Sequence, residues 1–371
     1  MIEFDRPSQQ FRLLLSTSQR LFRKIDPTRN RLTLRARSLY WLNSATQSVL
    51  YEIQKKSFQH ELDHIAPETP IFVLGFWRSG TTFLHELLCC DLRFGFPSTY
   101  ACLNPAHFLL SRRWVIPKDE HQVRRPMDDL RYSWNSPQED EFALFLLGAP
   151  SAYEALMVPS LMQNVERLLD LDKRSAEDQE LWWNTFEYLL RLLTLEQKKA
   201  MVLKSPTHGF RMGTLQRRFE HARYVVIERN PYEVFASNLK LWRTLVDRYG
   251  LERCSDIQLE QFVLASYTLH QQKVWEGTER SRAGCVAEVR YEDLVKNPIE
   301  QISRIYSKLD LGDFSAVLPR LEEHLASVAS HQRNRLRLSR SQKEKIDSLW
   351  GEIIHRRGYA WPEETVEIYD A

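Results

Sequence analysis

The chain of 371 residues lacks the features that mark several specialised classes of protein. It has no apolar run near the roughly 18 to 20 residues that cross a bilayer, and no signal-peptide core with a cleavage site. Its five cysteines form no CxxC pair, and the adjacent Cys89 and Cys90 are poorly placed for a strain-free disulfide. We therefore expect a cytoplasmic protein in a reducing compartment.

The chain also has no excess of one charge. Its 51 basic and 49 acidic residues give a formal net charge of +2, so the net charge of the whole chain does not favour nucleic acid as a partner. A hydrophobic content of 43% and a charged content of 27% are typical of a folded globular protein. There is no internal repeat or low-complexity tract, and the length allows two average domains or one enlarged domain.

Four short apolar runs predict buried parallel strands. These runs are residues 71–76, 201–204, 224–228 and 285–289. Residues 91–200, between the first and second runs, are mostly helical in pattern and rich in aromatic residues and leucine. An insertion of this kind commonly builds the wall of a substrate pocket. Helices are also predicted at 298–309 and 341–357, with a polar segment at 331–339.

Residues 1–66 are predicted to form an N-terminal helical extension. Apolar Phe11, Leu14 and Leu21 alternate there with basic Arg20 and Lys24 at helical spacing. We expect this apolar face to pack on the rest of the protein. Peripheral contact with an anionic membrane is the alternative.

Residues 75–82 read Gly-Phe-Trp-Arg-Ser-Gly-Thr-Thr, between an apolar run and a helical pattern. Backbone N–H groups in such a turn, together with the positive end of the following helix, bind an anion. A triphosphatase loop would carry lysine where this chain has Thr81, and the cation here is Arg78 instead. The residues that we expect to hold a phosphate-like group are Arg78, Ser79, Gly80, Thr81 and Thr82.

A second motif follows the run at 224–228. Arg229 comes directly after that run, and Ser237 stands eight positions later. A guanidinium and a hydroxyl suit a phosphate. Ligands of open α/β sheets lie outside the carboxyl ends of the strands, so this motif and the loop would face the same crevice. Two phosphate sites at one crevice indicate a single nucleotide that occupies both of them.

These motifs resemble those of the sulfotransferases that use 3'-phosphoadenosine 5'-phosphosulfate, PAPS. The family's 5'-phosphosulfate loop, a basic residue followed by Ser-Gly-Thr-Thr, matches residues 78–82, and its 3'-phosphate motif matches Arg229 and Ser237. The segment Arg290-Tyr291-Glu292-Asp293-Leu294 resembles the exit of the family's fourth strand. The resemblance covers about residues 68–360 and is closest to the bacterial branch with Gly-x-x-Arg-Ser-Gly-Thr-Thr loops.

The resemblance implies a fold and a domain organisation. We expect a single P-loop-like α/β domain over residues 67–371, with a central parallel sheet of about five strands flanked by helices. The helical insertion at 91–200 would form the acceptor pocket.

The resemblance also implies roles for single residues. Phe83 would stack on adenine, and Lys204 would be aimed at the sulfate or the leaving phosphate. Independently of the resemblance, His208 follows a strand end and could reach the acceptor, so it is a further catalytic candidate. One of Arg333 and Arg335 would close over the nucleotide, although a solvated charge run is the alternative.

The transfer needs a base, and the glutamate that several members carry soon after the loop is missing here. The best carboxylates follow Ser136 and Pro137, which could cap and begin a helix with Glu139, Asp140 and Glu141 in its first turn. We prefer Glu139 and then Glu141 as general base. A structural role is the alternative, because the helix dipole alone favours acidic residues there.

We therefore expect a PAPS-dependent sulfotransferase that needs no metal. It would move the sulfuryl group to a hydroxyl of a carbohydrate, a lipid-like molecule or another small molecule, and release 3',5'-ADP. The alternatives are a non-catalytic module that binds 3',5'-ADP or PAPS, and a kinase or triphosphatase, which the missing loop lysine argues against. The acceptor and the oligomeric state stay open.

Overall fold

The computed structural model of the protein describes residues 11–26, 28, 33–116, 123–124, 131–328 and 336–369. Contacts divide the chain into two compact units. Unit 1 comprises Met1–Glu68, Gly95–Met201 and Trp242–Leu259, and unit 2 comprises Thr69–Phe94, Val202–Leu241 and Glu260–Ala371.

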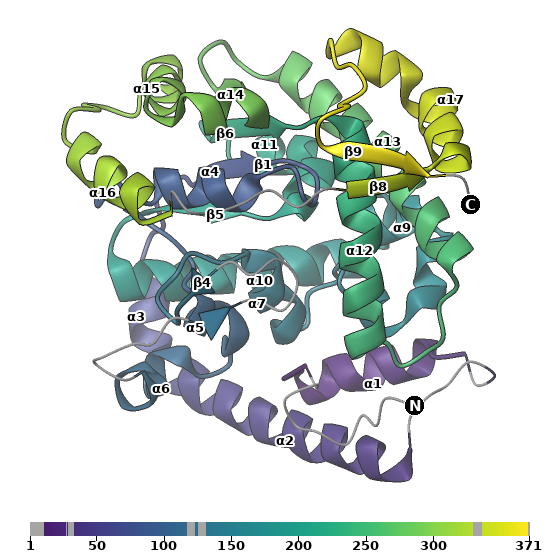
Figure 1. Ribbon diagram of the computed structural model, residues 1–371. Helices are drawn as coiled ribbons and strands as arrows, with labels where there is room; N and C mark the ends of the chain where they lie inside the picture. The colour runs from purple at the N-terminus through teal and green to yellow at the C-terminus, as the bar shows by residue number, and fades with distance from the viewer. Residues whose placement is uncertain are drawn as a thin grey trace. The chain divides into compact units, whose positions relative to one another are not determined.

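Unit 1 is mostly helical (Figure 1). Its helices are α1 (Leu15–Lys24), α2 (Leu34–Ser57), α3 (Gln59–His64), α5 (Thr99–Leu103), α6 (Phe108–Val115), α7 (Asp140–Leu147), α8 (Glu154–Met157), α9 (Val165–Leu169) and α10 (Ala176–Gln197), with 3-10 turns η2 (Pro159–Gln163) and η3 (Leu171–Lys173). A short antiparallel ribbon joins β3 (Val123–Arg124) to β4 (Arg131–Tyr132).

Helix α1 packs its apolar face inside unit 1. Phe11 and Leu21 are buried, and the ring of Phe11 meets the edge of another ring, Phe145, at a centroid distance of 5.2 Å. On the basic side, Arg20 and Lys24 pair with the buried carboxylate of Glu154 at 3.2 and 2.8 Å. The apolar face of this segment therefore packs on other residues of the protein, as expected.

The central sheet has five strands in the order β2-β5-β1-β6-β7. The strands are β1 (Ile71–Leu74), β2 (Phe94–Gly95), β5 (Ala200–Lys204), β6 (Arg223–Glu228) and β7 (Val286–Arg290). The pairings of β1 with β5, β1 with β6 and β6 with β7 are all parallel. The four apolar runs are thus confirmed as strands, and the central parallel sheet is confirmed. The fifth strand, β2, has two residues and is too short to show as an apolar run.

Helices follow the strands of unit 2 and complete it. They are α4 (Thr81–Leu88), α11 (Met212–Arg218), α14 (Tyr291–Lys296), α15 (Pro298–Leu309), α16 (Leu318–Val328) and α17 (Arg340–Arg356), with the 3-10 turn η4 (Pro206–Arg211). Two longer helices, α12 (Pro231–Tyr249) and α13 (Asp256–Arg280), have residues in both units. Helix α17 begins with a capping box between Ser339 and Gln342.

Opposite faces of the sheet carry different side chains, because successive residues of a strand point to opposite sides. On one face, Val73 and Val225 belong to an apolar cluster with Leu84 of α4 and Ile305 of α15. On the other face, the ring of Phe72 stacks on Tyr224 at a centroid distance of 5.5 Å. Phe72 and Tyr224 are 0% and 2% exposed, so side chains on both faces are buried. The loops at the carboxyl ends of the strands are therefore where a ligand can bind.

A second small sheet was not predicted. Strand β8 (Leu336–Ser339) pairs in parallel with β9 (Val366–Tyr369), and α17 connects them. Residues 336–339 belong to the segment that the sequence indicated only as polar. No helix within the described ranges is long and apolar enough to span a membrane.

Candidate active site

The turn between β1 and α4 has a conformation that few residues adopt. Arg78 has a φ of 68° and Gly80 a φ of 97°, both in the left-handed region. A Cβ at Gly80 would lie 2.2 Å from the ring of Tyr291, so only glycine fits there. The N–H of Ser79 donates to the carbonyl oxygen of Phe76 at 3.1 Å and closes the turn. The turn thus leads directly into the N-terminus of α4, where backbone N–H groups favour an anion.

The hydroxyl of Ser79 is set inside this turn. The residue is 2% exposed, and its Oγ has no hydrogen-bond partner among the described residues. A Cβ at Gly75 would lie 2.6 Å from that oxygen, so the missing side chain of Gly75 makes room for it. Buried hydroxyls nearly always have a partner. A ligand oxygen would supply one, so the turn fits the phosphosulfate end of PAPS.

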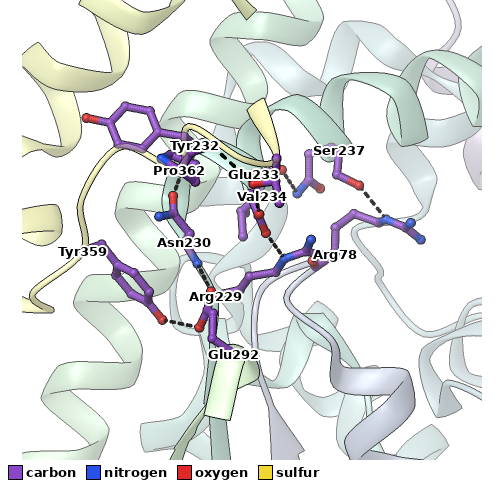
Figure 2. A network of polar contacts seen from close by, with 12 residues as sticks. Arg78, Arg229, Asn230, Tyr232, Glu233, Val234, Ser237, Glu292, Tyr359 and Pro362 are labelled. Carbon is purple, nitrogen blue, oxygen red and sulfur yellow. Dashed lines mark hydrogen bonds and ion pairs between the residues drawn. The ribbon is translucent and has the colours of Figure 1, made fainter. Parts of the chain in front are cut away.

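Arg78 joins this loop to the second predicted motif. Its Nε donates a 2.9 Å hydrogen bond to the Oγ of Ser237 on α12. In the other direction, Nη1 of Arg229 donates to the carbonyl oxygen of Arg78 at 3.2 Å. Figure 2 shows the three side chains gathered at this point. The structure therefore brings together the two motifs that the sequence places far apart.

Two further side chains orient Arg229. Its Nε donates to Oε2 of Glu233 at 2.6 Å, one helical turn further along. The guanidinium also lies over the ring of Tyr291, 4.5 Å from the centroid, within the range of a cation–π contact. The same ring covers Gly80 of the loop. Tyr291 therefore lies between the two motifs.

Glu228 directly precedes Arg229 and is an unusual carboxyl. Burial raises its pKa to about 7, although the nearby Arg357 acts to lower it. Arg357 forms an ion pair with Glu228 at 2.6 Å. The carboxyl directly before Arg229 therefore titrates near neutral pH.

Lys204 and Phe83 lie on elements that flank the loop. Lys204 ends β5, is 1% exposed, and is the register partner of Val73 on β1. Phe83, in the first turn of α4, is half-buried and packs against the apolar cluster beneath that helix. These placements leave the predicted roles of Lys204 at the sulfate and of Phe83 at adenine as predictions.

His208 is buried on the face of the sheet that carries Phe72. It is 0% exposed, and its ring meets the ring of Phe72 edge-on at a centroid distance of 5.4 Å. This environment favours a packing role over contact with an acceptor.

The predicted carboxylates belong to unit 1. Helix α7 begins at Asp140, so Glu139 is its N-cap residue. The prediction that Glu139 lies in the first turn of this helix is therefore wrong. The first turn holds Asp140 and Glu141 only, because Glu139 is still extended. Ahead of it, Pro137 forms a bridge with Ser98. Glu139 accepts a short hydrogen bond from the hydroxyl of Tyr153.

Glu141 is buried and accepts a 2.6 Å hydrogen bond from Ser151. Arg333 and Arg335, the remaining candidates, lie outside the described residues. In the part of the chain that is described, no cluster of three or more His, Cys, Asp or Glu side chains could hold a metal ion.

Three residues that hold the site together were not predicted from the sequence. Glu233 carried a signal, because an acid four positions after Arg229, in the first turn of the helix that follows, can form an ion pair with it. Asn238 is fully buried, and its Nδ2 donates to the carbonyl oxygen of Trp77 at 2.7 Å, which ties α12 to the loop. For Tyr291, no local pattern indicates that its ring reaches Gly80.

The sheet order, the phosphate-type turn and the paired arginines define a P-loop-like α/β protein. Residues 70–316 match the sulfotransferase family. A curated relative, the omega-hydroxy-beta-dihydromenaquinone-9 sulfotransferase Stf3 of Mycobacterium tuberculosis, is 37% identical over 324 residues, covering 86% of this chain and 83% of the relative. The same protein of Mycobacterium bovis matches equally. The chain belongs to the sulfotransferase family.

Solved structures agree on the fold. The sulfotransferase STF9 from Mycobacterium avium superposes with a TM-score of 0.66 at 17% identity, covering 91% of this chain and 87% of that one. STF1 from Mycobacterium tuberculosis superposes with a TM-score of 0.63 at 17% identity, covering 91% of each chain. The predicted α/β fold and the predicted class, a PAPS-dependent sulfotransferase, are confirmed.

Proposed function

We propose that the loop and the second motif together hold PAPS. Ser79 and the N–H groups that open α4 would bind the 5'-phosphosulfate, and Arg229 with Ser237 would bind the 3'-phosphate. The observation that carries this assignment is the hydrogen bond of 2.9 Å between Arg78 and Ser237, which joins the two anion sites. Two arginines and a helix N-terminus suit a ligand with a phosphate at each end.

Calorimetry with 3',5'-ADP tests this assignment. Arg78→Ala and Arg229→Ala should each weaken binding by about 10-fold to 100-fold, because each removes charge-assisted hydrogen bonds. Arg304→Ala is a matched control, since Arg304 is an exposed side chain on α15. Unchanged affinity in either of the first two variants would show that the nucleotide binds elsewhere.

The chemistry follows from this placement. PAPS supplies an activated sulfuryl group, which moves to the acceptor oxygen as the bond from sulfur to the phosphate oxygen breaks. Arg78 and Lys204 would stabilise the charge that develops on the leaving phosphate. A carboxylate would take the proton of the acceptor hydroxyl. Fixed cations supply the neutralising charge, so the assigned residues call for no metal.

Glu139 is the base that we propose, with Glu141 second. The hydroxyl of Tyr153 holds the carboxylate of Glu139, whereas Glu141 is fully buried and bonded to Ser151. Glu139→Gln should therefore reduce turnover by about 100-fold or more while 3',5'-ADP affinity stays normal. Glu141→Gln is the comparison. Full turnover in Glu139→Gln would remove this residue as base.

We propose a lipid-like alcohol as the acceptor, ahead of a carbohydrate. The name of the curated relative specifies an omega-hydroxylated menaquinone derivative, and that relative shares 37% identity over most of both chains. The helical insertion at 91–200 would supply the pocket. Radiolabelled PAPS offered with a long polyprenyl alcohol should give a labelled lipid, and the same lipid without the hydroxyl should give none. Label on a sugar alone would contradict this proposal.

Peripheral membrane contact of the N-terminal segment stays a prediction. Sedimentation with vesicles of neutral and of anionic lipid tests it. Binding that increases with the anionic fraction would support contact through basic side chains.

A further inference from the structure

The guanidinium of Arg229 is held by a carboxylate, and that carboxylate is held by the C-terminal segment, residues 357–369. Oε2 of Glu233 accepts from Nε of Arg229 at 2.6 Å, and Oε1 of the same carboxylate accepts a short hydrogen bond from the hydroxyl of Thr365. Thr365 directly precedes β9. Both oxygens of Glu233 are thus engaged, one by the binding residue and one by the end of the chain.

The same C-terminal segment contacts the neighbours of Arg229. Arg357 pairs with Glu228 at 2.6 Å, and the carbonyl oxygen of Ala360 accepts from Nδ2 of Asn230 at 2.8 Å. The ring of Trp361 meets that of Tyr232 at a centroid distance of 4.8 Å. These contacts fix the backbone around Arg229, and the Thr365–Glu233 pair fixes its side chain.

The orientation of Arg229 matters because a guanidinium binds phosphate through donors in one plane. Two of its N–H groups are used inside the protein, one on Glu233 and one on the carbonyl oxygen of Arg78 (Figure 2). The remaining donors of the same rigid plane can bind phosphate oxygens. A change at Glu233 would let the plane rotate, and ordering it again on binding would cost affinity.

We propose that Glu233 and Thr365 are positioning residues for the 3'-phosphate. By fixing the plane of Arg229 they set how strongly the enzyme prefers a nucleotide with a 3'-phosphate over one without it. This inference rests on the proposed function of Arg229. It adds Thr365 of the C-terminal segment to the determinants of donor selectivity.

The test compares two ligands, 3',5'-ADP and 5'-AMP, which differ only in the 3'-phosphate. In the full chain, Thr365→Val should lower the ratio of their affinities about fivefold to tenfold, with 5'-AMP affinity unchanged. Thr365→Ser keeps the hydroxyl and should restore the ratio. Thr268→Val is the matched control, because among the described residues the hydroxyl of Thr268 donates only to the carbonyl oxygen of Leu264 in its own helix, at 3.2 Å.

A second variant separates a positioning role from a loss of folded protein. Glu233→Gln keeps the shape of the side chain but removes its charge, so the ratio should again decrease while the melting temperature stays close to that of the parent. A lowered melting temperature with an unchanged ratio in both variants would mean that the pair is only structural, and would overturn the inference.

Arg229→Ala separates this inference from the proposed function. It should abolish most of the preference for 3',5'-ADP. If it does not, Arg229 does not bind the 3'-phosphate and the proposed function is wrong. If it does, while Thr365→Val leaves the ratio unchanged, only the positioning role is wrong.

Discussion

The Nε of Arg78 donates a 2.9 Å hydrogen bond to the Oγ of Ser237, a residue 159 positions further along the chain. One of these residues comes from the turn after β1, and the other comes from the helix after β6. Because β1 and β6 are neighbours in a parallel sheet, their following segments leave the same edge. This hydrogen bond, together with the one from Arg229 to the carbonyl oxygen of Arg78, joins the two motifs.

Ser237→Ala tests the contribution of this hydroxyl. We expect 3',5'-ADP affinity to decrease about fivefold to tenfold, because the variant loses a proposed phosphate donor and frees Arg78 to reorient. Calorimetry measures the change. Ser303→Ala, on α15, should match the parent, and equal affinities in both variants would exclude Ser237 from the site.

Gly80→Ala should destabilise the loop and abolish nucleotide binding. The φ of 97° strains any side chain, and the new Cβ would lie 2.2 Å from the ring of Tyr291. We expect a loss of about 1 to 3 kcal/mol in the free energy of unfolding. Urea unfolding and calorimetry report the two effects.

Gly351→Ala is the matched control. Gly351 lies inside α17, and a Cβ there meets nothing within 4 Å. Alanine should stabilise this helix by about 0.5 to 1 kcal/mol and leave nucleotide affinity unchanged. Equal stability effects at the two glycines would contradict the loop geometry.

Tyr291→Leu should weaken 3',5'-ADP binding about threefold to tenfold. The ring face that lies 4.5 Å from the guanidinium of Arg229 is lost, and with it a cation–π contact of about 0.5 to 2 kcal/mol. Tyr291→Phe keeps the ring and should bind nearly as the parent does. A phenylalanine variant as weak as the leucine variant would assign the effect to the hydroxyl instead.

Glu228 should make stability depend on pH. Its pKa is raised by burial to about 7 in the folded protein, against a reference value of 4.5. The folded state therefore binds this proton more tightly, and stability is full below pH 4.5 and declines as pH rises through about 7. The decline amounts to roughly 3 kcal/mol at most.

Glu228→Gln should flatten this dependence. Urea unfolding between pH 4 and 8 measures the slope for the parent, for this variant and for Glu300→Gln, whose side chain is exposed. The exposed control should keep the slope of the parent. Identical slopes in all three proteins would show that Glu228 does not titrate in this range.

The local sequence pattern predicted those strands and helices whose formation depends on residues that are close in sequence. The buried strands show as apolar runs, and α15 begins at Pro298 and ends at Leu309, as its pattern predicts. Helix α7 begins later than predicted, because a bridge between Pro137 and Ser98 keeps the chain extended ahead of it. Parallel pairing of β8 with β9 was not predictable, since a parallel register across a helix depends on contacts that are distant in sequence.

The sequence by itself determined the donor chemistry of this protein. A glycine turn with Arg78 in place of the triphosphatase lysine, and an arginine with a serine eight positions later, are patterns of backbone conformation and charge that need no partner to be recognised. Only the tertiary structure decided how those groups are held. Tyr291, Glu233 and Thr365 reach the motifs through space, and no local spacing encodes which ring covers Gly80 or which hydroxyl steadies the carboxylate behind Arg229.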